Sequence, residues 1–284
     1  MKERERFITV GDGQRLFSTE VGAGPPVLLC DGLGCDGYIW QHLRPALARE
    51  HRVIHWHYRG HGKSDSPRVW SELAVPTLIR DMIAVLDAYE VERCTLIGHS
   101  MGVQVILQAA VDHPQRFDAV IPMCGSYGRP LDTFYGTDTM LHVLPVVLEA
   151  SERFTGLGQR LWSAVNEWPV AREFARTREM GAVAFEQVRP YFEHMAGMDM
   201  RVFFRTLAHL RDHSVEGALD QIRMPTLIIA GEHDSFTPVW LSRKMARLIP
   251  NAELVVVSGG SHVTPLEEPG LVEEHVLEFL DNRV

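Results

Sequence analysis

The stretch Gly98-His99-Ser100-Met101-Gly102 decides the fold of this chain, because it places a serine between two glycines where a strand turns into a helix. Residues 94–97 are an apolar run typical of a buried strand, and apolar residues recur with helical spacing over residues 103–110. In so tight a turn the serine takes a strained backbone conformation, which requires residues without side chains two positions before and after it. Ser100 then lies at a helix N-terminus, where unpaired amides favour negative charge. The stretch predicts a nucleophilic serine; the alternative is an ordinary glycine-flanked turn.

Composition and charge restrict the class of protein. The chain has 284 residues, of which 45% are hydrophobic and 23% charged, enough for one large core and an insertion. A net charge of −9 argues against nucleic acid or an anionic membrane surface as a partner. The charged residues 1–6 lack the apolar stretch of a secretory signal, and no run is long enough to span a membrane. We therefore expect a cytoplasmic protein.

The four cysteines do not indicate a cofactor or a disulfide framework. Cys30, Cys35, Cys94 and Cys124 lack the spacing of a metal site and are too few to staple a chain of this length. We expect them to be reduced core residues. No cofactor is predicted.

Short apolar strands alternate with helical segments along most of the chain, which predicts an α/β protein. Residues 7–10 and 15–21 are expected to form an antiparallel hairpin at one edge of a mostly parallel, eight-stranded sheet with helices on both faces. Strand signals vanish between residues 128 and 214, so this segment is interpreted as a helical cap inserted into a core domain of residues 1–127 and 215–284. The further core strands are expected at residues 27–30, 53–57, 94–97, 119–123, 225–230 and 253–257, and core helices at 38–48, 75–89 and 271–280.

An acid and a base follow the last two expected strands. Asp234 closes Gly231-Glu232-His233-Asp234, and His262 closes Gly259-Gly260-Ser261-His262. The carboxyl ends of parallel strands meet at one edge of a sheet, where Ser100 also lies. A serine hydroxyl needs a base to remove its proton, and imidazole suits this task when a carboxylate orients it. The candidate catalytic residues are Ser100, His262 and Asp234, with Glu232 as a rival acid and His233 as a surface residue.

These motifs, together with Arg59-Gly60-His61-Gly62-Lys63-Ser64, resemble the α/β-hydrolase superfamily over essentially the whole chain. The resemblance is to the lid-bearing branch of esterases, lipases, perhydrolases and carbon–carbon bond hydrolases. It implies that Asp234 is the acid and that the backbone N–H groups of Leu33 and Met101 form an oxyanion hole.

Asp31 departs from the family pattern, since many relatives have histidine directly before the glycine of this loop. A carboxylate beside a developing oxyanion opposes it, so Asp31 must be turned away, paired or protonated. Arg59 or His57 is the expected partner. His55 and His57 share a strand face, yet no carboxylate or thiolate is visible to complete a metal site, and no metal is predicted.

Serine as the nucleophile excludes the dehalogenase and epoxide-hydrolase chemistry that relatives perform with aspartate. The leading hypothesis is hydrolysis of a small to medium hydrophobic ester through an acyl-serine. Peracid formation, carbon–carbon cleavage, lactone or thioester hydrolysis and acyl transfer remain open, as does a ligand receptor without turnover. Large apolar side chains of the cap either pack it onto the sheet or line a substrate pocket, for which Trp162 and Met198 are the candidates. The sequence leaves the oligomeric state open.

Overall fold

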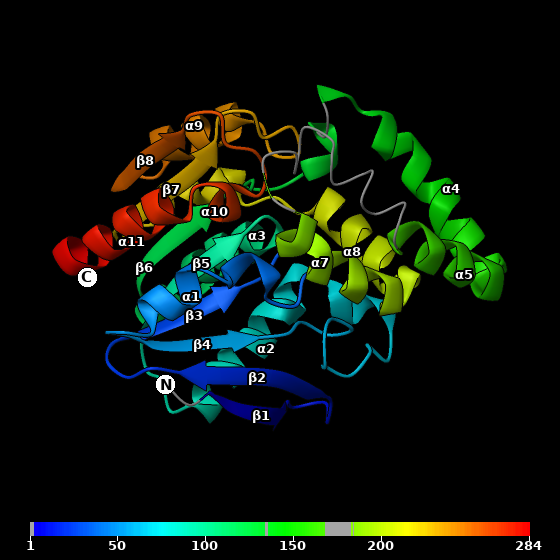
Figure 1. Ribbon diagram of the computed structural model, residues 1–284, viewed down its shortest axis with the longest axis horizontal. Coiled ribbons are helices and arrows are strands. Elements are labelled where there is room, and N and C mark those ends of the chain that lie inside the picture. The colour runs from blue at the N-terminus through cyan, green and yellow to red at the C-terminus, as the bar shows by residue number, and fades with distance from the viewer. Residues whose placement is uncertain (1–2, 134–135, 168–182, 184) are drawn as a thin grey trace.

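A single sheet of eight strands forms the centre of the molecule (Figure 1), in a computed structural model that describes every residue except 1–2, 134–135, 168–182 and 184. The spatial order is β1-β2-β4-β3-β5-β6-β7-β8. β1 pairs with β2 and β2 with β4 in antiparallel fashion, and every other pair is parallel. The strands are β1 (Arg4–Thr9), β2 (Arg15–Val21), β3 (Pro26–Cys30), β4 (Arg52–Trp56), β5 (Cys94–His99), β6 (Phe117–Met123), β7 (Thr226–Gly231) and β8 (Ala252–Val257). The predicted α/β architecture with an antiparallel edge hairpin is confirmed.

Helices cover both faces of the sheet, and each face has its own apolar core. On one face pack α2 (Val75–Ala88), α3 (Met101–Asp112) and α9 (Val239–Leu248). On the other pack α1 (Leu43–Leu47), α10 (Thr264–Glu267) and α11 (Pro269–Arg283). Short 3₁₀ turns join these elements at η1 (Tyr38–Trp40), η2 (Trp70–Leu73), η3 (Pro114–Arg116), η4 (Pro130–Asp132) and η6 (Glu216–Gln221).

The helix predicted over residues 38–48 is divided into η1 and α1. Pro45 has no N–H with which to reach the carbonyl of Gln41, so one helix cannot continue through this segment. The division leaves Trp40 in its own turn, buried against the sheet at 1% exposure. This turn holds the indole that meets Asp31, as described below.

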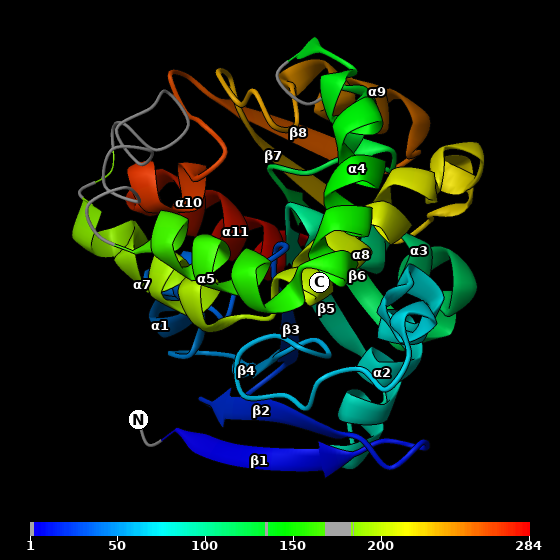
Figure 2. The ribbon, with the colours of Figure 1, turned by 90° about the vertical axis from the view of Figure 1, so that its right-hand side faces the viewer.

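The segment between β6 and β7 contains α4 (Thr139–Arg153), α5 (Thr155–Asn166), α7 (Phe185–Gly197) and α8 (Met200–Asp212). These helices lie together beside the sheet in Figure 1 and in front of it in Figure 2. α7 contains Pro190 and buries Val188, Phe192 and Met195. None of the helices in the described part of the chain is both long enough and apolar enough to cross a membrane.

An antiparallel bridge joins Gly128 to Ser214, the two ends of the expected cap. We retain residues 128–214 as a proposed cap on residues 1–127 and 215–284. Residues 134–135, 168–182 and 184 of that cap lie outside the described part of the chain.

Candidate active site

Ser100 occupies the turn between β5 and α3, where its backbone is strained. Its φ of 53° lies in the left-handed region, which residues other than glycine seldom adopt. A Cβ on Gly98 would lie 2.7 Å from the carbonyl oxygen of Gly102, and one on Gly102 would lie 2.2 Å from that of Cys30. Both contacts are with backbone, which cannot move aside. The two glycines therefore permit the turn that presents Ser100 at the start of α3.

A continuous hydrogen-bonded line joins Ser100, His262 and Asp234. Ser100 Oγ lies 2.9 Å from His262 Nε2, and His262 Nδ1 lies 3.0 Å from Asp234 Oδ2. A carboxylate can only accept, so Nδ1–H donates to it and Nε2 is left to accept the serine proton. The loops after β5, β7 and β8 thus bring the three predicted catalytic residues together.

The carboxylate of Asp234 is fixed by a turn that the sequence did not reveal. Its Oδ1 accepts from the backbone N–H groups of Phe236 and Thr237 at 2.9 and 2.8 Å, and its Oδ2 accepts from the Thr237 hydroxyl at 2.7 Å. The residue is 4% exposed. By contrast, Glu232 and His233 are exposed, and the Glu232 carboxylate accepts from Ser258 and Gly259. The rival acid therefore has other partners, and Asp234 is the carboxylate at His262 Nδ1.

The loop after β3 lies against the serine. A Cβ on Gly32 would be 3.1 Å from Ser100 Cβ, and Leu33 and Met101 both line the cavity that contains Ser100. Within the described residues, neither the Leu33 nor the Met101 backbone N–H has a hydrogen-bond acceptor. Two free donors beside a nucleophile are what an oxyanion hole requires.

Asp31 is paired, but not with the partners expected from sequence. It is fully buried, accepts from the Trp40 indole N–H at 2.6 Å, and lies 2.8 Å from His55 Nε2. Burial raises the pKa of its carboxyl, but the charge and hydrogen bond of His55 outweigh burial and hold the pKa below its usual value. His55 belongs to β4, which pairs with β3 on the side opposite to β5 and Ser100.

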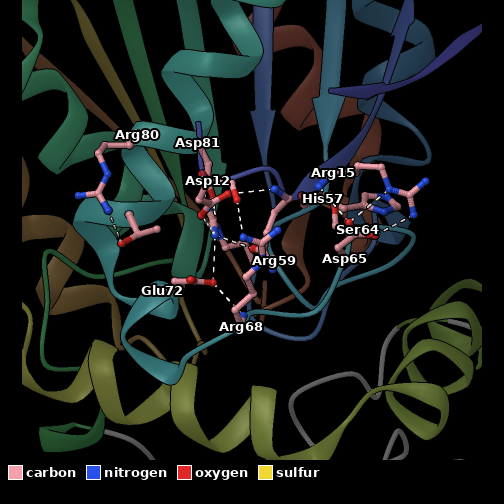
Figure 3. Close-up of polar contacts among 12 residues, drawn as sticks. Asp12, Arg15, His57, Arg59, Ser64, Asp65, Arg68, Glu72, Arg80 and Asp81 are labelled. Atoms are coloured by element: carbon pink, nitrogen blue, oxygen red, sulfur yellow. Dashed lines mark hydrogen bonds and ion pairs between the residues drawn. The ribbon is translucent and has the colours of Figure 1, made fainter. Parts of the chain in front are cut away.

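Arg59 and His57 have other roles, which corrects the expected pairing. Arg59 binds Asp81 of α2, on the opposite face of the sheet from Trp40, and also Asp12 (Figure 3). His57 Nδ1 accepts from the Lys63 backbone N–H at 2.9 Å. Burial, followed by the neighbouring His55, lowers the pKa of His57 to about 3, so this ring is neutral. No group of three or more potential ligands suited to a metal ion occurs in the described residues.

A cavity of about 250 Å³ opens beside Ser100 and His262. Its wall combines the loops of the sheet edge with the cap helices and is predominantly apolar. The apolar and aromatic lining residues include Leu33, Tyr38, Met101, Leu131, Met140, Tyr191, Phe203, Phe204, Leu207, Leu210 and Phe236. Such a wall suits an uncharged, hydrophobic substrate.

Trp162 and Met198 do not line this cavity, so their positions do not support the prediction that they bind substrate. The Trp162 ring packs against Phe203 and Phe204 with centroids 5.0 and 5.3 Å away, and its N–H donates to the Met195 carbonyl at 2.6 Å. Met198 is 4% exposed and belongs to the apolar cluster that the helices between β6 and β7 form with η2. Both residues pack behind side chains that line the cavity and do not themselves face it.

Replacing Asp31 tests whether its charge or its hydrogen bonds matter. Asp31→Asn retains an acceptor for Trp40 and supplies a donor for His55, so we expect kcat/KM within about threefold of wild type. Asp31→Ala leaves two buried polar rings unpaired, with an expected loss of about 1–3 kcal/mol of unfolding free energy and a lower kcat. Urea denaturation and ester kinetics measure both effects. A large loss of kcat in Asp31→Asn alone would show that the charge itself acts in catalysis.

The pH dependence of the free energy of unfolding also tests the pairing of Asp31 with His55. Because the pKa of Asp31 is lower in the folded chain than in the unfolded chain, ionisation stabilises the fold above about pH 4. This contribution is lost as the pH falls through the folded-state pKa. Asp31→Asn lacks the group, so its stability should fall less steeply than that of wild type in acid.

The mostly parallel sheet and the serine turn at the end of β5 are those of an α/β hydrolase. The chain belongs to the family described as alpha/beta hydrolase fold, which it matches over residues 25–269. It is 26% identical over 271 residues to the putative carbamate hydrolase RutD of Pseudomonas savastanoi pv. phaseolicola, covering 90% of this chain and 94% of that protein.

Two solved structures are similar over nearly the full length. A hydrolase from Pseudomonas aeruginosa PA01 shares 26% identity with a TM-score of 0.78 and 98% of each chain covered. Est816, described as an N-acyl homoserine lactone degrading enzyme, shares 26% identity with a TM-score of 0.74, covering 96% of this chain and 100% of that one. The resemblance predicted from sequence is therefore confirmed at the level of the family.

Proposed function

We propose that this protein is a serine hydrolase that cleaves a carboxylic ester of a small to medium hydrophobic substrate through an acyl-serine intermediate. One observation carries the proposal: His262 Nε2 lies 2.9 Å from Ser100 Oγ, while its Nδ1 is held by the buried Asp234 carboxylate. This is the arrangement that activates a serine for attack on a carbonyl.

In the proposed reaction His262 takes the proton of Ser100 as Oγ attacks the ester carbonyl. The N–H groups of Leu33 and Met101 stabilise the oxyanion, and the dipole of α3 adds to their effect. His262 then gives the proton to the departing alcohol, which leaves an acyl-serine. Water, deprotonated by the same imidazole, releases the acid and restores Ser100.

Active-site labelling tests whether the protein is a catalyst or a receptor without turnover. A fluorophosphonate probe is expected to label wild type at Ser100 and to leave Ser100→Ala unlabelled. Absence of labelling in folded wild type would contradict the proposal. The probe requires an activated serine but no particular substrate, so its result is independent of the natural ester.

The size of the cavity predicts which acyl-chain lengths the protein hydrolyses best. A volume of about 250 Å³ is small, so p-nitrophenyl esters with short to medium acyl chains should have higher kcat/KM than the palmitoyl ester. Replacement of Phe204, which lines the wall, by alanine should move the optimum to longer chains. Rates that rise steadily up to palmitoyl would contradict the proposed size class.

Carbamate hydrolysis is the second candidate, favoured by the name of the RutD relatives. The same triad can attack a carbamate carbonyl, and the lactone named for Est816 is a cyclic ester. A panel that sets esters, a lactone and a carbamate of similar size against one another separates these substrates by kcat/KM.

A further inference from the structure

Gln104 is a polar residue in an otherwise apolar part of α3, and it lines the cavity one helical turn beyond Ser100. Positions four residues apart share a face of a helix, about 6 Å apart along its axis. Its side chain is 1% exposed, so it does not serve the solvated surface. A buried amide on the wall of a substrate cavity requires hydrogen-bond partners.

One end of this amide joins a chain of hydrogen bonds that leads out of the cavity to the surface. His213 Nδ1 lies 2.9 Å from Gln104 Oε1, and His213 Nε2 lies 3.2 Å from Gln108 Oε1, so each ring nitrogen faces an amide oxygen. Gln108 Nε2 donates to the carboxylate of the exposed Asp112 at 2.9 Å. The other end of the Gln104 amide has no hydrogen-bond partner among the residues that the structure describes.

The chain of bonds fixes which end of Gln104 faces the cavity. The Asp112 carboxylate only accepts, so Gln108 must donate to it and turn its oxygen to His213, whose Nε2 then donates. Burial lowers the pKa of His213, although Asp112 acts against it, and the neutral ring has a bare lone pair at Nδ1. A neutral imidazole donates from one nitrogen only, and Nε2 already donates to Gln108, so Nδ1 cannot donate to the Gln104 Oε1 that faces it. A half-turn of the terminal amide places its NH₂ group at His213 and the oxygen toward the cavity.

We propose that Gln104 is a specificity-determining residue whose carbonyl oxygen accepts a hydrogen bond from an N–H or O–H group of the substrate near the scissile carbonyl. The inference rests on the proposed ester hydrolysis and narrows its substrate class to esters that carry such a donor. The hydroxyls of Ser126 and Thr237, which also line the wall, already donate to Gly128 and Asp234. In this proposal Gln104 Oε1 is an unpaired acceptor that His213 holds in a fixed orientation on the mostly apolar cavity wall.

Matched substrates test this role. We would use p-nitrophenyl pentanoate and three analogues of similar length in which the α, β or γ position carries a donor: the N-propyl carbamate and the 3-hydroxy and 4-hydroxy pentanoyl esters, each corrected for its release of p-nitrophenolate without enzyme. The measured quantity is the ratio of second-order rate constants, donor ester over pentanoate, from the initial release of p-nitrophenolate. In wild type this ratio is expected to exceed about ten for at least one donor position, because a buried acceptor left unpaired penalises the plain chain.

Three variants locate the source of that ratio. Gln104→Leu is expected to lower it about tenfold, and His213→Phe to lower it as well, because the amide loses the group that orients it. Gln159→Leu is the matched control. The Gln159 amide donates to the Met198 carbonyl and accepts from Met200 N–H inside the cap, away from the cavity wall, so its loss should leave the ratio unchanged.

A wild-type ratio near one at all three positions overturns the inference, as does a ratio that survives in Gln104→Leu. Either result leaves the proposed function standing if pentanoate is hydrolysed and Ser100 is labelled. Failure of the proposed function would instead appear as absence of labelling and of pentanoate turnover in wild type. The two ideas therefore fail in distinguishable ways.

Discussion

Ser100→Ala is expected to reduce kcat/KM for a p-nitrophenyl ester by at least about 10⁴-fold while leaving the fold intact. The hydroxyl is the atom that forms the acyl bond, and the oxyanion donors alone stabilise attack by water only weakly. Thermal unfolding should be unchanged or slightly favourable to the variant, since the strained φ of 53° belongs to the backbone and not to the hydroxyl. Ester kinetics and calorimetry measure the two quantities separately.

The triad should also behave as a unit. His262→Ala is expected to cost about as much as Ser100→Ala, and the double variant no more than either alone, because one missing member disables the rest. Ser151→Ala is the matched control, since this buried serine of α4 donates its hydroxyl to the Leu148 carbonyl of its own helix. If Ser100→Ala retained turnover, or if the losses of the two single variants multiplied in the double variant, the proposed nucleophile and base would be wrong.

The positions of these three residues could be predicted because backbone geometry dictates them. Gly98 and Gly102 have no room for a Cβ, so their spacing around Ser100 records the turn directly in the sequence. Asp234 and His262 follow parallel strands, whose carboxyl ends meet at one edge of the sheet. Each of these inferences uses only local structure and chain order.

The contacts that could not be predicted from the sequence are those between side chains of different strands and helices. Asp31 pairs with His55 because β3 and β4 are in register at Leu29 and His55, and with Trp40 because η1 turns its indole inward. Apolar periodicity marks Trp162 as buried, but the packing of α5 against α7 decides that it faces other cap residues and not the cavity. Gln104 stands out in the sequence as a polar residue within an apolar helix. Its position on the cavity wall, which is seen only in the structure, is what indicates a role in substrate binding.

Arg59→Met is expected to lower the free energy of unfolding by about 3–5 kcal/mol, the usual cost of removing one partner of a buried ion pair. Arg59 and Asp81 are each almost fully buried, with the guanidinium 2.7 Å from Asp81 Oδ1. The guanidinium is further bonded to Gln14. It also bonds to Glu72 (Figure 3). These bonds tie the loop after β4 to the hairpin turn and to α2. Methionine preserves much of the volume but leaves the Asp81 charge unpaired.

The pH dependence and a matched control distinguish this cause from a general packing defect. Burial already raises the pKa of Asp81, and loss of Arg59 should raise it further. The destabilisation of Arg59→Met should therefore be greatest at high pH, where Asp81 must be ionised, and should shrink as the pH falls through the raised pKa. Arg15→Met removes a similar but exposed pair with Asp65, whose side chains are 59% and 35% exposed, and should destabilise the fold far less than Arg59→Met. Urea denaturation of both variants at pH 8 and pH 5.5 decides the matter: equal, pH-independent losses would show that the buried charge of Asp81 is not what Arg59 stabilises.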